Sequence, residues 1–302
     1  MKVFLVDGTY ELFRHYHGAP KHLGLDGTEV GATRAALGSM LGMLEGGASY
    51  MAVATDHVIE SWRNAAWPSY KSSAGVPADL LGQFSLFEDA LAALGLVVWP
   101  MVDLEADDAL ASGAAVLNGD ERLDQVLICT PDKDLGQCVR GTRVVCLDRR
   151  KDLVVDEAAV RARFGVAPAA VPDWLALVGD SADGYPGLPG WGPKAASVVL
   201  GHYGDMASVP LSGAPWPVEL PLTRQARLRE ALREGWEQAQ LFKRLATCVL
   251  RPELLPPGPA ALDSLQWAGP GPGLAALCDR LGSPGLHRRA EALAATRAGG
   301  GR

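Results

Sequence analysis

Val126-Leu-Ile-Cys-Thr-Pro-Asp-Lys-Asp134 joins a short apolar run to two acids that follow it almost directly. Stretches with helical periodicity, such as Thr33–Leu44 and Leu80–Leu94, lie between this run and others like it. Short apolar strands that alternate with helices are typical of a parallel sheet covered on both faces. The sequence therefore predicts an α/β fold, with further strands at Val3–Val6, Tyr50–Ala54, Leu96–Trp99 and Arg143–Leu147.

Acids follow three of the expected strands. Asp7 and Asp56 each end an apolar run, and Asp132 and Asp134 follow the run that begins at Val126. Open α/β sheets place their sites at the carboxyl ends of the strands. Taken singly, each of these acids also fits a turn, so only the joint pattern indicates a site.

A denser acidic group opens the helix expected after Glu105. Three acids, Glu105, Asp107 and Asp108, fall within four residues, which is more than one helix cap needs. Crowding of this kind is costly unless a cation relieves it. Asp180 and Asp183 form a further pair that also fits a turn followed by a helix cap. Carboxylates without paired Cys or His suit Mg²⁺ or Mn²⁺, and two such ions roughly 4 Å apart can hydrolyse phosphodiesters.

A glycine-rich hairpin, Gly187 to Ala196, follows the last acidic pair. A Gly-x-Gly turn that enters a helix can direct backbone N–H groups at a phosphate, and Lys194 would add charge. The alternative is an ordinary link between two helices. A β-branched residue at Gly192 is expected to disfavour a positive φ there and to crowd the backbone.

The composition is that of an ordinary globular protein. The 302 residues are 48% hydrophobic and 21% charged, without an apolar run of the ~18 residues that a membrane span needs. Five scattered cysteines suit the cytoplasm.

A net charge of −7 is unusual for a nucleic-acid binder. Either the chain does not bind nucleic acid, or bound metal neutralises an acid site while a local basic face binds the nucleic acid. The candidate residues for such a face are Arg224, Arg227, Arg229, Arg233, Lys243 and Arg244. The same residues fit the solvated surface of a helix nearly as well.

Beyond about Asp156 the pattern becomes helical. Helices are expected at Glu157–Phe164, Val171–Val178 and Lys194–Tyr203, followed by a proline-rich linker at Pro210–Pro221. A long Arg-rich helical stretch spans Thr223–Leu250. The chain then closes with a Pro/Gly-rich loop and short helices at Leu274–Leu281 and His287–Ala295.

Five segments in this order resemble the 5′ nuclease family, which includes bacterial 5′–3′ exonucleases, phage flap endonucleases and the N-terminal nuclease domain of bacterial DNA polymerase I. The segments are FLVDGTYELFR, VATDHVIESWRNAAWPSYK, EADDALA, TPDKDLGQ and GDSADGYPGLPGWGPKAASVVL. The resemblance implies a PIN-like parallel-sheet nuclease core in residues 1–165. It also implies a helical helix–three-turn–helix DNA-binding subdomain in 166–256, with a closing loop and helices in 257–302.

The resemblance also implies roles for single residues. The family's metal ligands match Asp7, Asp56, Glu105, Asp107, Asp108, Asp132, Asp134, Asp180 and Asp183, which would hold two Mg²⁺ or Mn²⁺ ions. The catalytic positions match Lys71, Asp7, Asp107 and Asp132. The DNA-binding positions match Arg14, Arg63, Tyr70, Lys71, Gly187, Gly190, Gly192 and Lys194, and the hairpin is also expected to bind K⁺.

The sequence departs from the family pattern in places. Ser72–Gly75 carries no second basic residue after Lys71, Gly184 stands where Asn is usual, and Phe13 where Tyr is usual. Because no polymerase domain follows, we expect a stand-alone, monomeric, cytoplasmic and nucleoid-associated enzyme. Its expected activity is metal-dependent 5′–3′ exonuclease and flap endonuclease hydrolysis in replication or repair. The substrates would be duplex DNA with a 5′ flap, nick or recessed end, with no membrane involved.

Two rival functions stay open from the sequence. A PIN-domain ribonuclease shares the sheet and the acids, although the hairpin and the Asp180/Asp183 pair disfavour it. A non-catalytic binder of branched DNA would not need the intact set of acids.

Overall fold

The structure is a computed structural model that describes residues 1–299, and the chain divides into two compact units. Unit 1 comprises Met1–Ile59, Ser73–Thr130 and the chain from Leu250 on; unit 2 comprises Glu60–Ser72 and Pro131–Val249. The division differs from the expected boundaries at 165 and 256, because residues 131–165 pack within unit 2. The domain boundaries themselves stay a prediction.

Unit 1 is built around four parallel strands in the order β3-β2-β1-β4. Its register pairs Val6 with Val53 and with Cys129. The elements of unit 1 are β1 (Lys2–Asp7), α1 (Gly8–Gly18), α2 (Gly31–Glu45), β2 (Tyr50–Asp56), α4 (Ala78–Leu81), α5 (Gln83–Ala93), β3 (Val97–Met101), α6 (Ala106–Leu117), β4 (Gln125–Cys129), η3 (Pro252–Leu254), α12 (Ala260–Asp263), α13 (Leu274–Arg280) and α14 (Pro284–Gly299).

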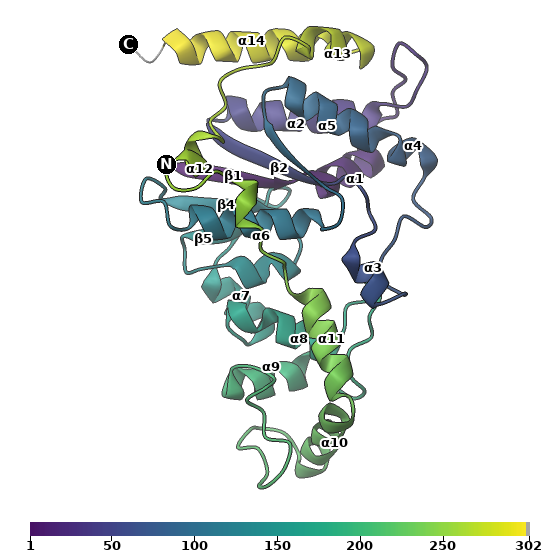
Figure 1. Ribbon diagram of the computed structural model, residues 1–302, viewed down its shortest axis with the longest axis vertical. Coiled ribbons are helices and arrows are strands. Elements are labelled where there is room, and N and C mark those ends of the chain that lie inside the picture. Colours follow the sequence, from purple (N-terminus) through teal and green to yellow (C-terminus); the bar gives the residue numbers. More distant parts are fainter. Residues whose placement is uncertain (300–302) are drawn as a thin grey trace. The chain divides into compact units, whose positions relative to one another are not determined.

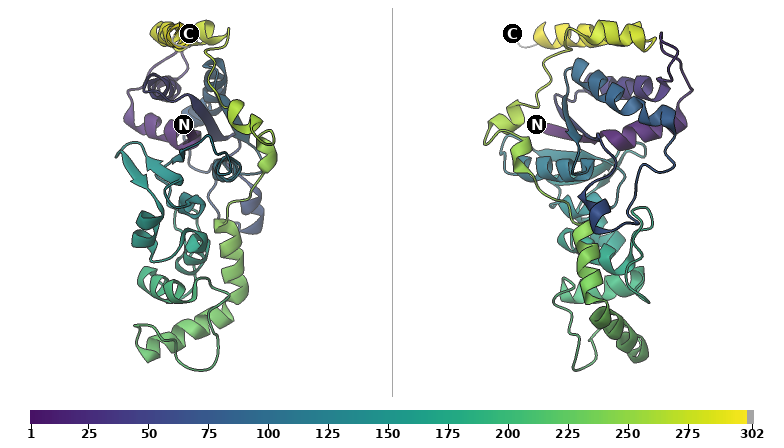
Figure 2. Two further views of the ribbon diagram at one scale, coloured as in Figure 1. Left: turned by 90° about the vertical axis from the view of Figure 1, so that its left-hand side faces the viewer. Right: turned by 45° about the vertical axis from the view of Figure 1, so that its right-hand side comes forward.

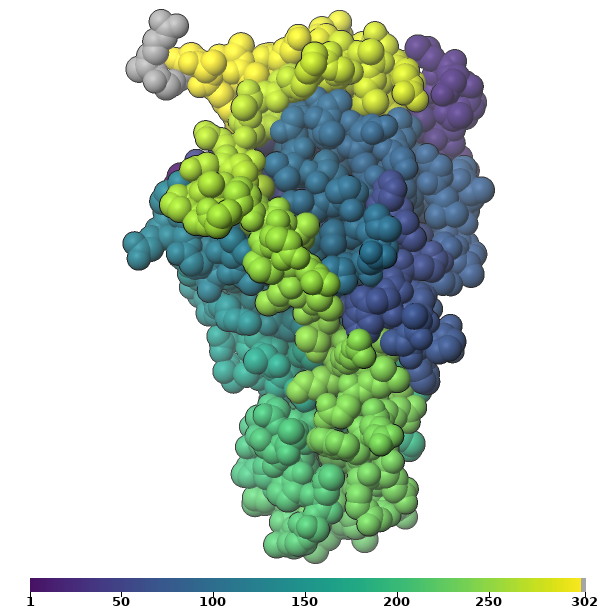
Figure 3. Space-filling model, viewed as in Figure 1, coloured from purple at the N-terminus to yellow at the C-terminus, as the bar shows by residue number. Residues whose placement is uncertain are grey.

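Helices cover both faces of these strands (Figure 1). Helix α6 packs on one face against β1, β2 and β3, while α1, α2 and α5 lie on the other face. The C-terminal helices α13 and α14 pack on α5 and α2 respectively and form an outer layer, drawn in yellow in the space-filling view (Figure 3). The middle of each strand is apolar, as expected where both faces of a sheet are covered, and Val3, Leu5 and Val53 have no solvent exposure.

The structure confirms the predicted α/β class and the expected strands of unit 1. The helix expected at Leu80–Leu94 is interrupted at Gly82, between α4 and α5. Glycine is a poor residue for a helix interior, and this local preference outweighs the apolar periodicity of the stretch. Among the described residues, no helix is both long and apolar enough to span a membrane.

Unit 2 is mainly helical (Figure 2). Its elements are α3 (Trp62–Ala66), η1 (Asp134–Cys138), β5 (Val144–Asp148), β6 (Leu153–Val155), α7 (Glu157–Phe164), η2 (Pro168–Ala170), α8 (Val171–Val178), α9 (Pro193–Tyr203), α10 (Leu222–Glu234) and α11 (Trp236–Ala246). Helices α7 and α8 have the predicted bounds. The stretch expected as one helix at Thr223–Leu250 is instead α10 and α11, which meet at Gly235.

Strand β6 has no counterpart among the predicted elements. It pairs with β5 in antiparallel fashion, with Cys146 opposite Val155. A partly exposed strand of three residues leaves no apolar run long enough to be recognised.

The core of unit 2 centres on Phe242 of α11, which has no solvent exposure. Its ring stacks on Tyr185 with centroids 5.3 Å apart and meets the edge of Trp67 at 5.2 Å. One aromatic side chain thus ties α11 to two loops that the sequence places near function, since Tyr185 follows the Asp180/Asp183 pair and Trp67 precedes Lys71. Aromatic pairs of this geometry contribute about 0.5–1.5 kcal/mol each beyond the area that they bury.

Candidate active site

The five acids of unit 1 lie at the carboxyl edge of its sheet, as the sequence predicts. Asp7 ends β1 and caps α1, with Oδ1 accepting from the backbone N–H of Tyr10 at 2.8 Å and Oδ2 from the hydroxyl of Thr130 at 2.9 Å. Asp56 ends β2, and its Oδ1 accepts from the N–H of Ala106 at 2.7 Å. The parallel register brings the ends of β1 and β2 and the start of α6 to one edge.

Glu105 and Asp108 form a reciprocal capping box at the start of α6. The side chain of Asp108 accepts from the N–H of Glu105 at 3.1 Å, and the side chain of Glu105 accepts from the N–H of Asp108. Two of the three crowded acids thus have a capping role, which the sequence analysis had assigned to one acid at most. Asp107 takes no part in the box and is half-buried.

The four acids of unit 2 come from two loops. Ligand atoms of Asp134, Asp180 and Asp183 all lie within 4.8 Å of one another, the one such group among residues 1–299. Asp132 is exposed, and its Oδ1 accepts from the N–H of Asp134 at 2.8 Å, which fixes the loop. Asp180 similarly accepts from the N–H of Ala182 at 2.9 Å, the expected Asx turn.

Burial and mutual repulsion make this cluster unstable as a set of bare anions. Burial, followed by the charges of Asp132, Asp183 and Asp180, raises the pKa of Asp134 to about 7 although Lys133 acts against the shift. Lys133 Nζ lies 3.1 Å from Asp134 Oδ1 and also pairs with Asp180. Burial alone would lower the pKa of Lys133, but Asp134 and Asp180 outweigh it and hold the lysine protonated.

The donor set of unit 2 fits a divalent cation. Asp134 Oδ1 is buried and accepts no hydrogen bond. Its one neighbour described above is the charged ammonium group of Lys133. Three carboxylates without a thiol or imidazole are the donors that Mg²⁺ and Mn²⁺ prefer. Asp134, Asp180 and Asp183 are therefore the residues of unit 2 that could hold an ion.

Lys71 and Tyr70 lie directly beside this cluster, within unit 2. Lys71 Nζ is 3.4 Å from Asp183 Oδ1, and its backbone N–H donates to the carbonyl of Asp183 at 3.1 Å. The hydroxyl of Tyr70 donates to Asp183 Oδ2 at 3.2 Å. One carboxylate thus contacts both side chains. Tyr70 is only 5% exposed, which leaves little of its ring for stacking on a base; its predicted DNA contact stays a prediction.

The segment that carries Lys71 is held by contacts spread over its length. The side-chain amide of Asn64 donates to the carbonyl of Lys71 at 2.9 Å, and the indole N–H of Trp67 donates to the carbonyl of Gly184 at 3.0 Å. Gly184 has a φ of +83°, and a Cβ there would lie 2.0 Å from the carbonyl oxygen of Ser69. The absence of the asparagine usual at this position therefore has a local steric reason.

Arg63, predicted to lie near the DNA, has a structural role within unit 2. Its side chain is buried, at 3% exposure, and its Nε donates to the carbonyl of Leu245 at 2.8 Å while Nη2 reaches the carbonyl of Thr247 at 3.3 Å. The guanidinium therefore binds the C-terminus of α11, and the predicted DNA contact of Arg63 stays a prediction. Arg14, in unit 1, is half-buried and pairs with the buried Glu11 at 2.5 Å, so it too has a structural partner.

The glycine hairpin links α8 to α9, and Lys194 is exposed in the first turn of α9. Gly187 and Gly190 have positive φ values of 70° and 78°. The positive φ expected at Gly192 is wrong, because this residue has a φ of −127° and open space where a Cβ would lie. Its role in phosphate approach therefore does not rest on backbone conformation.

Most of the candidate basic face has partners inside unit 2. Lys243 pairs with the buried Asp173 at 2.9 Å, and Arg244 lies 4.9 Å from the ring centroid of Trp62. Arg229 donates to the carbonyls of Gly213 and Ala214, and Arg233 pairs with Glu230. Arg224 and Arg227 are exposed on α10.

Several residues of the site were not predicted. Lys133 pairs with Asp134, and Thr130 donates to Asp7. Both residues lie in the segment Val126–Asp134, but neither was predicted to belong to the site. Gln137 donates to the carbonyls of Asp134 and Ala246, both at 2.9 Å, and accepts from the N–H of Cys248 at 3.0 Å. Tyr185 has a buried hydroxyl without a hydrogen-bond partner, and burial beside the acids raises its pKa. Both residues lie in the quoted segments, but their contacts with α11, to Ala246 and Phe242, are distant in the chain and leave no local signal.

The raised pKa of Asp134 makes a prediction about stability. Between about pH 4 and 7 the folded, metal-free chain keeps a proton that the unfolded chain has released, so the contribution of this carboxyl to stability is lost as the pH rises through 7. Because asparagine stays neutral, Asp134→Asn is expected to raise the melting temperature in EDTA at pH 8 by roughly 5 °C, and much less at pH 5. Thermal unfolding followed by circular dichroism measures this.

The matched control is Glu121→Gln, which neutralises an exposed acid of unit 1. Its melting temperature is expected to differ little from that of the unsubstituted chain at either pH. Addition of Mg²⁺ at pH 8 is expected to stabilise the unsubstituted chain more than Asp134→Asn. A gain for Asp134→Asn of the same size at pH 5 and pH 8 contradicts the prediction.

The close approach at Gly184 makes a second prediction. Gly184→Ala is expected to lower the free energy of unfolding by about 2–3 kcal/mol, because the new methyl group meets the backbone at Ser69 and the positive φ disfavours alanine. Gly192→Ala, with open space and a negative φ, is expected to cost no more than about 1 kcal/mol. Urea unfolding of both variants tests this difference, and equal costs would show that Gly184 is not under steric constraint.

Comparison with known proteins places the chain in a family. Residues 2–165 match the model of the 5′–3′ exonuclease N-terminal resolvase-like domain, and residues 166–267 match that of the 5′–3′ exonuclease C-terminal SAM fold. A 5′–3′ exonuclease of Streptomyces coelicolor is 34% identical over 247 residues, which are 75% of this chain and 80% of that protein. DNA polymerase I of Pseudomonas aeruginosa is 32% identical over 245 residues, 80% of this chain but only 26% of the polymerase.

Solved structures agree on the fold. The zinc-bound 5′-exonuclease of bacteriophage T5 superposes with a TM-score of 0.65 at 17% identity, over 97% of this chain and 98% of that one. At this identity the match concerns the fold, a parallel-sheet α/β unit joined to a helical one. The chain spans about a quarter of the polymerases that it matches and most of the exonucleases. From the two family models and the Streptomyces relative together, we conclude that the chain belongs to the 5′–3′ exonuclease family of nucleases.

Proposed function

We propose that the chain is a metal-dependent 5′ nuclease that hydrolyses phosphodiesters in duplex DNA bearing a 5′ flap, nick or recessed end. The observation that carries the proposal is the group of Asp134 and Asp180, both buried, and Asp183, half-buried, with Lys71 3.4 Å from the carboxylate of Asp183. A cluster of anions beside a partly exposed cation suits a site that binds both a metal ion and a phosphate. Membership of the 5′–3′ exonuclease family supports the same reaction.

The proposal assigns metal binding to the nine acids that both units contribute. A divalent cation, Mg²⁺ or Mn²⁺ and in the proposal two of them, would supply Lewis acidity and an activated water. Asp134 would bind through the oxygen that now lacks a hydrogen bond, and Lys133 would give up its pairing with the carboxylates. Asp7, Asp107 and Asp132 are assigned to the catalytic set, Asp107 being the acid at the start of α6 that the capping box does not use.

Lys71 is assigned to the scissile phosphate. Its side chain is 34% exposed, so the ammonium group can leave Asp183 for a substrate, while the hydroxyl of Tyr70 keeps that carboxylate oriented. A positive charge at the phosphate stabilises the transition state more than the ground state. Lys71 is also the only lysine or arginine between Arg63 and Arg122, so no neighbour in that stretch can replace it.

DNA binding is assigned to the hairpin of Gly187, Gly190 and Gly192, with Lys194 in the first turn of α9. Backbone N–H groups at a helix start bind phosphates, and K⁺ bound by the hairpin is part of the proposal. Contacts of this kind read backbone shape rather than base sequence. We further propose that the enzyme acts as a monomer on DNA in the cytoplasm, at the nucleoid, in replication or repair. The helical module of unit 2 favours DNA over the rival ribonuclease function.

The direct test of this function uses 5′-labelled duplexes with a flap, a nick or a recessed end, each with a matched RNA-flap version. Release of short 5′ products in Mg²⁺, and none in EDTA, is expected on the DNA substrates. Preferential cleavage of RNA flaps would favour the ribonuclease, and stable binding without any cleavage would favour a non-catalytic binder.

The assignment of Lys71 makes a quantitative prediction. Lys71→Ala is expected to lower the single-turnover rate by roughly 10²-fold or more at saturating Mg²⁺, as for the loss of one positioned charge-stabilising group. The dissociation constant for DNA in Ca²⁺ should rise only a few-fold, and the salt dependence of binding should lose about one counterion. Lys151→Ala, which removes an exposed lysine of unit 2, serves as the control. An unchanged rate together with a large loss of affinity would make Lys71 a DNA-gripping residue only.

A further inference from the structure

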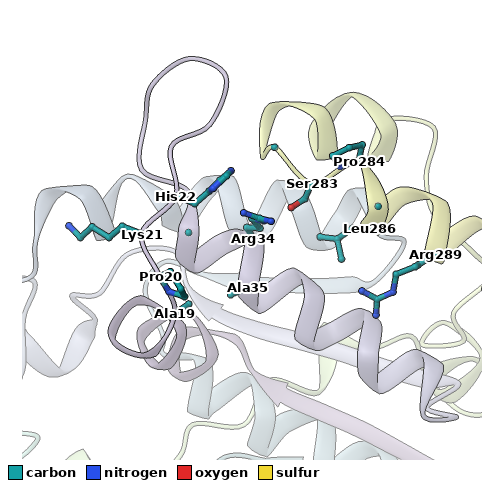
Figure 4. A pocket seen from close by; sticks show the side chains of 13 residues that line it. Ala19, Pro20, Lys21, His22, Arg34, Ala35, Ser283, Pro284, Leu286 and Arg289 are labelled. Carbon is teal, nitrogen blue, oxygen red and sulfur yellow. The ribbon is translucent and has the colours of Figure 1, made fainter.

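A cavity lies within unit 1, between α2 and the turn that joins α13 to α14 (Figure 4). Its volume is about 590 Å³, within the usual range for small-molecule pockets. Helix α2 contributes Arg34, the segment after α1 contributes His22, and the turn contributes Ser283 and the first residues of α14. None of the predicted metal ligands lines the cavity.

The lining of this cavity is electropositive. It includes Lys21, His22, Arg34 and Arg289 and no carboxylate. Lys21 pairs with Asp79 at 2.9 Å, and Arg289 pairs with Glu45 at 2.6 Å, so both are already compensated. The side chain of Arg34 has no ion pair or hydrogen bond with any described residue. Figure 4 shows its guanidinium directed across the cavity toward Ser283.

Ser283 provides a second, independent polar group. The residue is 8% exposed and precedes the first residue of α14, a helix of 16 residues. Its hydroxyl has no hydrogen-bond partner among the described residues, and Figure 4 shows the oxygen directed into the cavity. A hydroxyl that faces a cavity and has no partner in the protein is available to a ligand. The start of α14 adds the positive end of a helix dipole.

His22 completes the polar wall. Its Nε2 is buried without a hydrogen-bond partner and lies close to Gly282, where an added Cβ would be 2.5 Å from this nitrogen. The carboxylate of Glu29 is already engaged, since its Oε1 accepts from the backbone N–H groups of His22 and Gly31 at 3.0 and 2.8 Å. Arg34 and Ser283, together with His22 when its Nε2 carries a proton, can therefore donate to a bound acceptor.

We propose that this cavity binds a phosphate group, with Arg34 and Ser283 as its principal ligands. Arginine presents a planar fork that matches the geometry of a phosphate, and the hydroxyl and the start of α14 would contact the same oxygens. The phosphate can belong to a free phosphorylated small molecule or to a DNA backbone. The proposal stands apart from the nuclease function, because unit 1 forms this cavity from residues outside the acid set.

The test uses inorganic pyrophosphate and the full chain in EDTA, followed by isothermal titration calorimetry at constant ionic strength. Without divalent ions the acid clusters repel this anion, so a saturable signal reports the cavity. Arg34→Ala is expected to weaken binding about tenfold or more, and Ser283→Ala several-fold. Arg288→Ala removes an exposed charge of α14 that does not line the cavity, and this variant is expected to bind pyrophosphate as the unsubstituted chain does.

A second arm distinguishes the two sources of the phosphate. Fluorescence anisotropy measures binding of a nicked duplex to the same variants in Ca²⁺. A loss confined to Arg34→Ala and Ser283→Ala, with pyrophosphate competing, assigns the cavity to a DNA backbone phosphate. Unchanged duplex binding together with a loss of pyrophosphate binding assigns it to a free phosphorylated molecule. If Arg34→Ala binds both probes as the unsubstituted chain does, the proposal is wrong, and far-ultraviolet circular dichroism confirms that the variants are folded. Nuclease activity plays no part in these readouts, so the two proposals can fail separately.

Discussion

Repulsion between buried carboxylates is the constraint on which the proposed site depends. Asp134, Asp180 and Asp183 approach within 4.8 Å in a largely buried place, where like charges are expensive. Lys133 and Lys71 compensate part of this charge, and the raised pKa of Asp134 shows that part remains. Such a cluster persists only if the surrounding structure holds the two loops in place.

Helix α11 provides that support within unit 2. Phe242 packs on Tyr185 and Trp67, so the loop of Asp180 and the segment of Lys71 share one aromatic contact. The C-terminal carbonyls of α11 accept from Arg63, which lies in the segment of Lys71, and from Gln137, which lies in the helix of Asp134. A buried arginine that looks like a DNA ligand in sequence is thus a positioning residue. The helix that belongs to the proposed DNA-binding module also holds the acids.

The parts of this structure that could be predicted have local signals. The apolar runs that end in Asp7 and Asp56 identify buried parallel strands and place acids at their ends, which the structure of unit 1 confirms. The short strand β6 lacks such a signal. At Gly82 and Gly235, helical periodicity continues across the glycine and hides the end of one helix and the start of the next. Residues whose role depends on distant partners could not be found this way. Arg63 was placed near DNA because burial against Leu245 is not encoded next to it in the chain, and the negative φ of Gly192 likewise follows from the packing of the hairpin.

The account rests on the claim that the acids of unit 2 bind a divalent cation. The most direct test is a Mn²⁺ titration of the full chain at pH 8 without DNA, followed by electron paramagnetic resonance of the free ion. Asp183→Asn is compared with Asp152→Asn, which neutralises an exposed acid of the same unit. The account predicts that Asp183→Asn weakens the binding of one Mn²⁺ by about tenfold or more while Asp152→Asn binds as the unsubstituted chain does. Identical titrations for all three proteins, each with an intact unfolding transition, would contradict it.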